Sequence, residues 1–374
     1  MRPRHGEAIF MSNTVSKRQW DLARLFYVLG PFLMLLFVVA LFSTLLGIQD
    51  VRTQMDSTNA HGWSGFWHTV RVNPFWGEIY QGLRAFASGG NAKIVLTQTV
   101  IVAISALGMT IIIVSGGIDL SVGATVALTS VVGATLLLRN HSPVFVCVAT
   151  ILAGGIVGLA NGSVIAGLRM MPFIVTLGMM GIARGAAKWL AGNQTVNPTE
   201  NPVNNIMKLS APDDLLPLPQ GVWVAFGLAI IMAIIMRQTV FGRYVFAIGS
   251  NEATARLCGI RVQVQKLFIY WLAGLFFGLS GLMQLSRLTQ GDPTVANGLE
   301  LDIIAAVVIG GASLSGGTGS ILGSMIGALI MAVLRNGSNI MGWPNYMQEI
   351  IIGVVIILAV GLDRLRQSRS AAAN

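Results

Sequence analysis

The chain has 374 residues, of which 54% are hydrophobic and 10% are charged, with a net charge of +9 and a mean hydropathy of +0.71. Soluble domains carry about 25% charged residues, so this composition excludes an ordinary water-soluble domain. The basic residues flank apolar runs, where they suit cytoplasmic loops and anionic lipid rather than nucleic acid.

Apolar runs without any charge recur along the chain, for example over 25–47, 121–138 and 144–168. A helix that crosses the bilayer core needs about 20 such residues. The sequence therefore predicts an all-α polytopic membrane protein with about ten transmembrane helices. The predicted crossings lie near residues 25–47, 94–114, 121–138, 144–168, 171–190, 217–236, 265–287, 300–314, 319–337 and 345–362.

The predicted organisation is a cytoplasmic N-terminal segment over 1–24, a single transmembrane domain over 25–362 and a cytoplasmic tail over 363–374. The first apolar run is too long for a cleaved signal peptide and lacks a small-residue cleavage site, so we expect it to remain as the first span. A polar insert rich in Trp and Gly follows over 48–93, and we expect it on the periplasmic side.

Glycines at four-residue spacing mark possible contacts between helices. Helices in lipid associate by close backbone approach over small residues. Glycine is also common in membrane helices generally, which leaves either interpretation open for each set. The sets are Gly154 with Gly158 and Gly162, Gly274 with Gly278, and Gly323 with Gly327.

Two long apolar stretches each contain a glycine-rich break. Residues 94–138 carry a single charge, Asp119, and residues 303–334 carry none. Both breaks share the pattern Gly-Gly-x-x-Leu-Ser, which begins at Gly116 and at Gly310. The pattern indicates two related halves with broken or re-entrant helices near the substrate path, as in many transporters. A chance match between two membrane segments is the alternative.

Loops on the two sides of the predicted bundle differ in charge. The loop 191–216 has only Lys208 against three acids, whereas the loop 237–266 has five basic residues against Glu252. Cytoplasmic loops carry an excess of Lys and Arg, so we expect a cytoplasmic loop over 237–264 and both termini in the cytoplasm. The five basic residues are Arg237, Arg243, Arg256, Arg261 and Lys266.

The segment 242–260 encodes a short capped helix. Ser250 and Asn251 suit an N-cap, Glu252 suits the positive end of a helix, and Gly259 can take the left-handed position after its end. So short a helix is marginal in water by itself, and we therefore expect it to dock onto a partner. The spacing fits an energy-coupling element and an ordinary capped loop helix equally well.

The sequence contains no nucleotide-binding loop, since none of its five lysines follows a glycine. The four histidines form no metal-ligand cluster, and no catalytic constellation stands out. We therefore expect that the chain is not an enzyme and binds no metal or cofactor itself. Any uphill transport would draw its energy from another chain or from an ion gradient.

Four stretches, in order along 94–362, resemble the ribose/xylose/galactose-type ABC permeases. The first is Gly108-Met-Thr through Ser115-Gly-Gly-Ile-Asp-Leu-Ser-Val-Gly123, and the second is Pro172-Phe-Ile-Val-Thr-Leu-Gly178. The third is Phe241-Gly-Arg-Tyr-Val-Phe-Ala-Ile-Gly-Ser-Asn-Glu-Ala-Thr-Ala-Arg-Leu-Cys-Gly-Ile260, which resembles the coupling loop of that family. The fourth is Glu300-Leu-Asp-Ile-Ile-Ala-Ala-Val-Val-Ile-Gly-Gly-Ala-Ser-Leu-Ser-Gly-Gly317. The insert 48–93 is longer than this family leads us to expect, and its role stays open.

The resemblance implies a bacterial inner-membrane permease that imports a small sugar by alternating access. It also implies a second permease subunit, identical or related, a periplasmic sugar-binding protein and a cytoplasmic ABC ATPase. The ATPase would have two fused nucleotide-binding domains, which would hold the ATP and Mg²⁺. The residues implied for coupling to the ATPase are Gly249, Asn251, Glu252, Ala253, Ala255, Arg256 and Gly259.

Alternatives to a sugar permease remain. An ABC permease for a nucleoside, an autoinducer or a branched-chain amino acid would share the architecture. An ion-coupled secondary transporter would need deep carboxylates, and only Asp119 is a candidate.

Polar residues at membrane depth are expensive and are candidates for function. Asp119 either lines or gates the path or caps the next helix. Asp292, Glu300 and Asp302 are expected at the periplasmic face or against the binding protein, and Arg184 either pairs with an acid or reaches the periplasm. The path candidates, which could instead link helices, are Gln98, Asp119, Asn161, Gln284, Asn336 and Asn339.

Overall fold

The computed structural model describes residues 29–49, 82, 84, 86, 88–199, 202–208 and 217–372. The predicted N-terminal segment 1–24 and most of the predicted insert 48–93 lie outside the described residues. Within them the regular elements are helices, and the only β pairing is an isolated bridge between Val196 and Gly291. The predicted all-α class is therefore confirmed.

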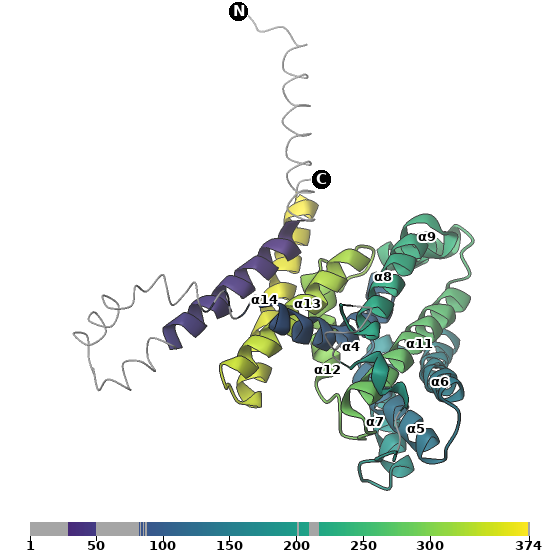
Figure 1. The fold of residues 1–374 in the computed structure, drawn as a ribbon. Coiled ribbons are helices and arrows are strands. Elements are labelled where there is room, and N and C mark those ends of the chain that lie inside the picture. Colours follow the sequence, from purple (N-terminus) through teal and green to yellow (C-terminus); the bar gives the residue numbers. More distant parts are fainter. Residues whose placement is uncertain are drawn as a thin grey trace, which may run out of the picture.

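The helices are arranged side by side in a bundle (Figure 1). A helix over Leu29–Gln49 precedes the labelled ones. The labelled α-helices are α4 (Gly89–Val114), α5 (Val122–Leu138), α6 (Pro143–Leu168), α7 (Pro172–Leu190), α8 (Gln220–Gln238), α9 (Val240–Ser250), α10 (Glu252–Leu257), α11 (Val262–Leu288), α12 (Leu299–Ile309), α13 (Ile321–Ile340) and α14 (Asn345–Ala372), and a 3-10 helix spans Pro202–Ile206.

Seven of the described helices are long and apolar enough to cross a membrane: the Leu29–Gln49 helix, α4, α6, α7, α8, α11 and α13. The helix α5 and the apolar part of α14, Asn345–Leu358, are shorter. These findings establish a polytopic helical membrane protein. The predicted count of about ten spans exceeds the seven helices that meet this criterion.

Two predicted boundaries differ from the structure. The predicted span 300–314 ends at Ile309, because the chain turns at Gly310 and Gly311, and Gly311 has a φ of +94°. The predicted loop over 237–264 contains an additional 11-residue helix, α9. This helix was not predicted, because the whole segment 237–264 was interpreted as a loop from its basic residues, although α9 itself carries only Arg243.

Glycines bring α6 and α11 into backbone contact. A side chain built at Gly154 would lie 2.5 Å from Cα of Gly278, and one at Gly274 would lie 2.9 Å from Cα of Gly158. Only glycine permits an approach this close, which in lipid replaces the hydrophobic driving force between helices. The structure therefore favours helix contact for these two glycine sets, and it pairs one set with the other, which the spacing did not predict.

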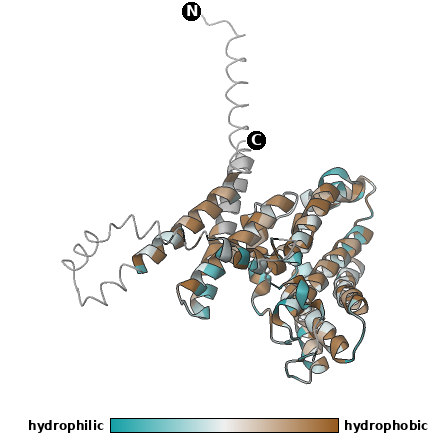
Figure 2. Ribbon diagram, in the orientation of Figure 1, coloured by the Kyte–Doolittle hydropathy of each residue, from teal (hydrophilic) through white to brown (hydrophobic). Residues whose placement is uncertain are grey.

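The helix α4 forms the centre of the bundle and is buried almost throughout, from Val100 to Val114. A helix that is apolar on every side has to be enclosed by other helices or by lipid. The outer helices instead expose apolar side chains such as Ile156, Ile182 and Ile230. Such faces suit contact with lipid or with another membrane subunit, and Figure 2 shows that hydrophobic residues predominate along the helices.

The connection between α11 and α12 folds back into the protein. Gly291 packs against Ala134 in α5, whereas a side chain at Gly123, near the start of α5, would touch Glu300 and the carbonyl oxygen of Ala296. These two contact points lie roughly 16 Å apart along α5 at 1.5 Å per residue. The chain therefore runs back along α5 before α12 begins, so α12 starts inside the bundle.

Candidate functional site

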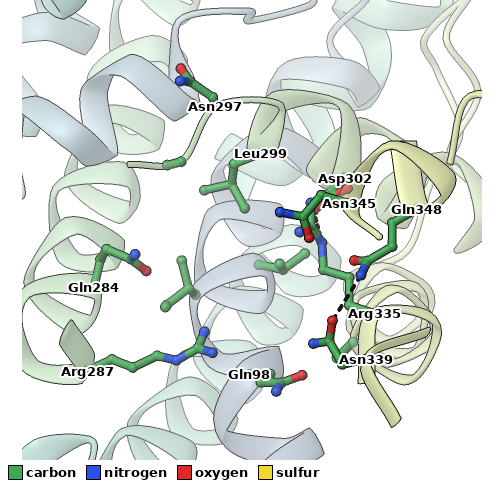
Figure 3. Close-up of a pocket in the computed structure, with 14 residues that line it drawn as sticks. Gln98, Gln284, Arg287, Asn297, Leu299, Asp302, Arg335, Asn339, Asn345 and Gln348 are labelled. Atoms are coloured by element: carbon green, nitrogen blue, oxygen red, sulfur yellow. Dashed lines mark hydrogen bonds and ion pairs between the residues drawn. The ribbon is translucent and has the colours of Figure 1, made fainter. Parts of the chain in front are cut away.

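A polar cavity of about 290 Å³ lies where α4, α11, α12, α13 and α14 meet (Figure 3). Its polar lining comes from all five helices and from the connection before α12, so no single segment of sequence encodes it. The lining residues are Gln98, Ile101, Val102, Gln284, Arg287, Ala296, Asn297, Leu299, Asp302, Ala332, Arg335, Asn339, Asn345 and Gln348.

Three of the predicted path residues, Gln98, Gln284 and Asn339, line this cavity. Gln98 comes from α4, Gln284 from α11 and Asn339 from α13, which places amide groups on separate walls (Figure 3). Asn339 also accepts a hydrogen bond at its Oδ1 from Nε2 of Gln348 at 2.9 Å, and this bond links α13 to α14. The cavity therefore offers several amide donors and acceptors at once.

The remaining path candidate on α13, Asn336, lies elsewhere. It is 4% exposed, and its Nδ2 donates to Oδ1 of Asn91 in α4 at 2.8 Å. This contact holds α13 against α4, which matches the alternative role of linking helices.

One carboxylate lies in the wall of the cavity and forms an ion pair there. Asp302 is fully buried near the start of α12, and its Oδ2 accepts a hydrogen bond at 2.7 Å from Nε of Arg335 in α13. Asp302 was expected at the periplasmic face, but the fold buries it because α12 starts inside the bundle. Its Oδ1 has no hydrogen-bond partner among the described residues.

A second guanidinium, that of Arg287, points toward the middle of the cavity from α11 (Figure 3). It has no ion pair or hydrogen bond with any residue that the structure describes. With one carboxylate against two guanidinium groups, the cavity has an excess of positive charge and many hydrogen-bond donors. Such a lining suits a polar solute with several oxygen atoms and offers no enclosed apolar space.

The two arginines were missed by the sequence reasoning. Arg287 and Arg335 lie near the ends of the predicted spans 265–287 and 319–337, where basic residues usually reach the membrane surface. Their shared position could not be inferred without knowing that the ends of α11 and α13 face each other.

Asp119 and Asn161 form a separate buried group that does not line the cavity. Oδ1 of Asp119 accepts hydrogen bonds from the backbone N–H of Ser121 at 2.7 Å and from its hydroxyl at 2.6 Å. Nδ2 of Asn161, in α6, donates to Oγ of Ser121 at 3.0 Å and to Oδ2 of Asp119 at 3.3 Å. Asp119 thus bonds to Ser121, the residue directly before α5, and not to an N–H group inside that helix.

The connection before α12 is held by another pair of polar contacts. Asp292 accepts hydrogen bonds from the N–H and the hydroxyl of Thr294, each at 2.7 Å. Arg184 in α7 donates to the backbone carbonyl oxygens of Pro293 at 3.0 Å and Val295 at 2.7 Å. Arg184 therefore bonds to backbone carbonyl groups, and Glu300 follows in the first turn of α12 with its carboxylate against α5.

The helix α10 has the caps expected of it. Oδ1 of Asn251 accepts from the backbone N–H of Thr254 at 2.9 Å, and Gly259 takes the left-handed conformation with a φ of +85°. Ala255 packs on Ile248 beneath the helix. Local capping and a small apolar contact therefore hold a helix that would be marginal alone.

Glu252 ties α10 to its neighbours. Its two carboxylate oxygens pair with Nζ of Lys266 in α11 at 2.7 Å and with Nη2 of Arg256 at 2.9 Å. The hydrogen bond from Lys266, and then the charges of Lys266 and Arg256, hold the pKa of Glu252 below its ordinary value of 4.5. Leu257, by contrast, is 89% exposed and touches little of the chain.

The end of α9 meets both glycine-rich breaks. The backbone N–H of Gly317 donates to the carbonyl oxygen of Val114 at 2.8 Å, which joins the two breaks directly. A side chain at Gly249 would collide with that same carbonyl group and lie 2.6 Å from the nitrogen of Gly317. Gly316, with a φ of +85°, lies against the carbonyl oxygen of Gly249. We call these five residues the glycine junction: Val114, Gly116, Gly249, Gly316 and Gly317.

The cavity and α10 lie toward opposite ends of the bundle. The helix α10 precedes Val262, the first residue of α11, whereas Gln284 is 22 residues later in the same helix. That separation is roughly 33 Å at 1.5 Å per residue.

Comparison with known proteins places these features in a family context. A family model described as branched-chain amino acid transport system / permease component matches residues 91–360. The ribose import permease of Escherichia coli (strain K12) is 40% identical over 277 residues, which cover 73% of this chain and 85% of that protein. The ribose import permease of Bacillus subtilis (strain 168) is 38% identical over 278 residues, 73% of this chain and 84% of that protein. The L-arabinose ABC transporter permease of Azospirillum brasilense is 34% identical over 287 residues, 77% of this chain and 84% of that protein. No solved structure matches.

Proposed function

Because this chain belongs to the branched-chain amino acid transport system / permease component family, we propose that it is the membrane subunit of an ABC importer for a small sugar. The observation that carries the choice of sugar is the 40% identity with a ribose import permease, supported by relatives named for arabinose and fructose. The polar cavity agrees with this choice, since amide and guanidinium groups suit a solute with several hydroxyls.

The partners follow from what the chain lacks and from the family. The sequence has no nucleotide-binding loop, so ATP and Mg²⁺ belong to a cytoplasmic ATPase, which we propose carries two fused nucleotide-binding domains. A periplasmic sugar-binding protein would deliver the solute, and a second identical or related permease subunit would complete the membrane part. The exposed apolar faces of α6, α7 and α8 leave room for such a neighbour.

In the proposed topology the chain crosses the bacterial inner membrane ten times with both ends in the cytoplasm. The seven long helices cross fully, α5 and α14 complete two further spans, and α12 forms the tenth with the break that follows it. The basic loop that holds α9 and α10 supports the cytoplasmic assignment of this side. In Figure 1, the start of the Leu29–Gln49 helix and the end of α14 lie toward the same side of the protein as α9.

The proposed mechanism is alternating access driven through α10. Closure of the ATPase would push α10, and because α9 ends directly before it, the push would reach Gly249 in the glycine junction. The junction touches both breaks, after α4 and after α12. Movement there would change how these helices enclose the cavity, whose residue Gln98 lies roughly 24 Å from Val114 along α4. The shared Gly-Gly-x-x-Leu-Ser pattern of the two breaks agrees with two related halves moving against each other.

The test is uptake by the complete importer reconstituted in proteoliposomes, with ATP inside and a panel of sugars, nucleosides and branched-chain amino acids outside. We expect ATP-dependent uptake of a sugar that persists when ionophores collapse proton and sodium gradients. A double substitution, Glu252→Ala with Gly259→Ala, should abolish uptake and transport-stimulated ATP hydrolysis while membrane insertion persists. Uptake that needs an ion gradient, or that survives without ATP, would overturn the assignment.

A further inference from the structure

We propose that the turn between α6 and α7, residues 168–171, forms one docking surface with α10 and binds an acidic region of the ATPase. The inference rests on the proposed function, because it assumes that an ATPase grips α10. It adds a second contact element, far from α10 in sequence, which the family motifs do not mark.

The turn and α10 share one groove. A groove of about 250 Å³ is lined by Arg169 and Met171 of the turn and by Glu252 and Arg256 of α10. Lys266 of α11 also lines this groove and pairs with Glu252. A partner that contacts the inner side of α10 therefore meets the turn as well.

Apolar side chains in the turn and on α10 are exposed. Leu257 on α10 is 89% exposed, and in the turn Leu168 is 70% and Met171 is 71% exposed. Leu168 and Leu257 each lie next in sequence to an arginine that lines the groove, Arg169 and Arg256. Exposed apolar groups with a polar rim mark protein contact sites, and methionine adapts readily to a partner surface.

The backbone of the turn is held in one conformation. Arg169 ends α6 in the left-handed region with a φ of +54°, and Pro172 begins α7 in its first turn. Proline fixes its own φ and restricts the residue before it. A turn shaped in advance loses little conformational entropy when it docks.

The charge of the groove selects the partner. Both carboxylate oxygens of Glu252 are engaged by Arg256 and Lys266, so this acid cannot neutralise a third basic group. Arg169 forms no ion pair with any residue in the described part of the chain. The groove therefore carries an excess of positive charge, and its partner surface should be acidic.

An anionic lipid surface would also attract Arg169. The ATPase is the better occupant, because the groove is continuous with the face of α10 that the proposed mechanism requires it to grip. The membrane alternative becomes an outcome of the test.

The test measures affinity between the permease in nanodiscs and the ATPase subunit that co-purifies with it from native membranes. The variants are Arg169→Glu and Met171→Ser in the turn. A third variant, Leu257→Ser in α10, reports whether the ATPase binds α10 itself. The matched control is Arg139→Glu, an exposed arginine at the end of α5, at the opposite end of α6 from the turn. We expect Arg169→Glu to weaken ATPase binding by about tenfold, because it reverses a charge at a close contact. We expect Met171→Ser to weaken binding by about the same factor, because it removes an apolar contact, and the control to bind normally.

Three results separate the possibilities. Weakening by Leu257→Ser but not by either turn variant would overturn the composite surface and leave the proposed function intact. If Arg169→Glu weakens ATPase binding in nanodiscs with anionic lipid but not in neutral ones, the turn contacts the membrane. That result would also overturn the composite surface. If no ATPase co-purifies with the wild-type permease, the proposed function itself fails.

Discussion

At the scale of single residues, one buried carboxylate forms an ion pair. Asp302 has no exposed surface, and Arg335 is its ion-pair partner. Breaking a buried pair by removing one partner is costly because it leaves a charge without compensation. The pair joins α12 to α13 in the cavity wall, so it ties the stability of the bundle to the shape of the cavity.

We predict that Arg335→Gln destabilises the protein by about 2 kcal/mol, less than the roughly 3–5 kcal/mol of a fully buried pair, because this arginine is 41% exposed. The double variant Asp302→Asn with Arg335→Gln should recover most of that loss, since neither charge remains. Thermal unfolding of the detergent-solubilised permease measures both. If the destabilisation of the double variant equals the sum of the losses from the two single substitutions, the ion-pair argument is contradicted.

Gly249 is the second residue at which a small change should have a large effect. We predict that Gly249→Ala lowers transport by about tenfold or more, because overpacking costs about 1–3 kcal/mol and the new methyl group would collide with Val114. Uptake per ATP hydrolysed is the measurement. Gly227→Ala on α8, where a side chain meets nothing within 4 Å, is the matched control and should transport normally.

At the scale of elements, α10 works as a unit because its charges are paired on both sides. Glu252 joins the helix to α11 through Lys266, and Asn251 closes its first turn. A partner that moves α10 therefore moves the start of α11 with it. The ion pair with Lys266 is therefore a second route by which movement of α10 can pass into the bundle, besides the route through α9 to the glycine junction.

The pH dependence of α10 follows from the lowered pKa of Glu252. Since the pKa in the folded protein lies below 4.5, the ion pairs contribute stability fully above pH 4.5 and lose it as the pH falls through the folded value. We predict that ATPase coupling by the wild type and by Glu252→Gln changes in parallel between pH 6 and 8. Stimulated ATP hydrolysis measured across that range is the check, and a difference confined to the wild type would point to another charge state of Glu252.

At the scale of the whole molecule, the glycine contact between α6 and α11 and the buried helix α4 make a rigid centre. The short helices α5 and α12 pack against this centre; α5 begins after the first break, and α12 ends at the second. The cavity lies toward one end of this framework and the docking helix toward the other. Transport in this arrangement requires that a movement of α10 reach the cavity at the other end of the bundle. The glycine junction is the place between them where the described segments are in contact.

The topology can be checked with the exposed thiol of Cys258, directly after α10. In a Cys147→Ser background, a membrane-impermeant maleimide should label Cys258 in inverted membrane vesicles and leave it unmodified in intact spheroplasts. The physical reason is that the proposed topology puts α10 on the cytoplasmic side. Labelling in intact spheroplasts would reverse the orientation of the chain.

The sequence alone determined the features that depend on neighbouring residues. Hydropathy marked the helices, and side chains such as Asn251 and Gly259 marked the caps of α10, because caps and membrane spans are decided by local hydrogen bonds and local apolar content. The glycine spacing marked possible helix contacts, although it did not say which helices meet. These properties can be read along the chain without knowing its path in space.

The tertiary structure alone decided which distant residues meet. It placed Arg287 and Arg335 in one cavity, assigned Asp119 to the turn before α5, and buried Asp302 by folding the connection before α12 back into the bundle. It also brought Gly249 against both breaks and the turn at Arg169 beside α10. Such meetings depend on how whole helices pack, which is a sum of many weak contacts between segments and leaves no mark in any short stretch of sequence.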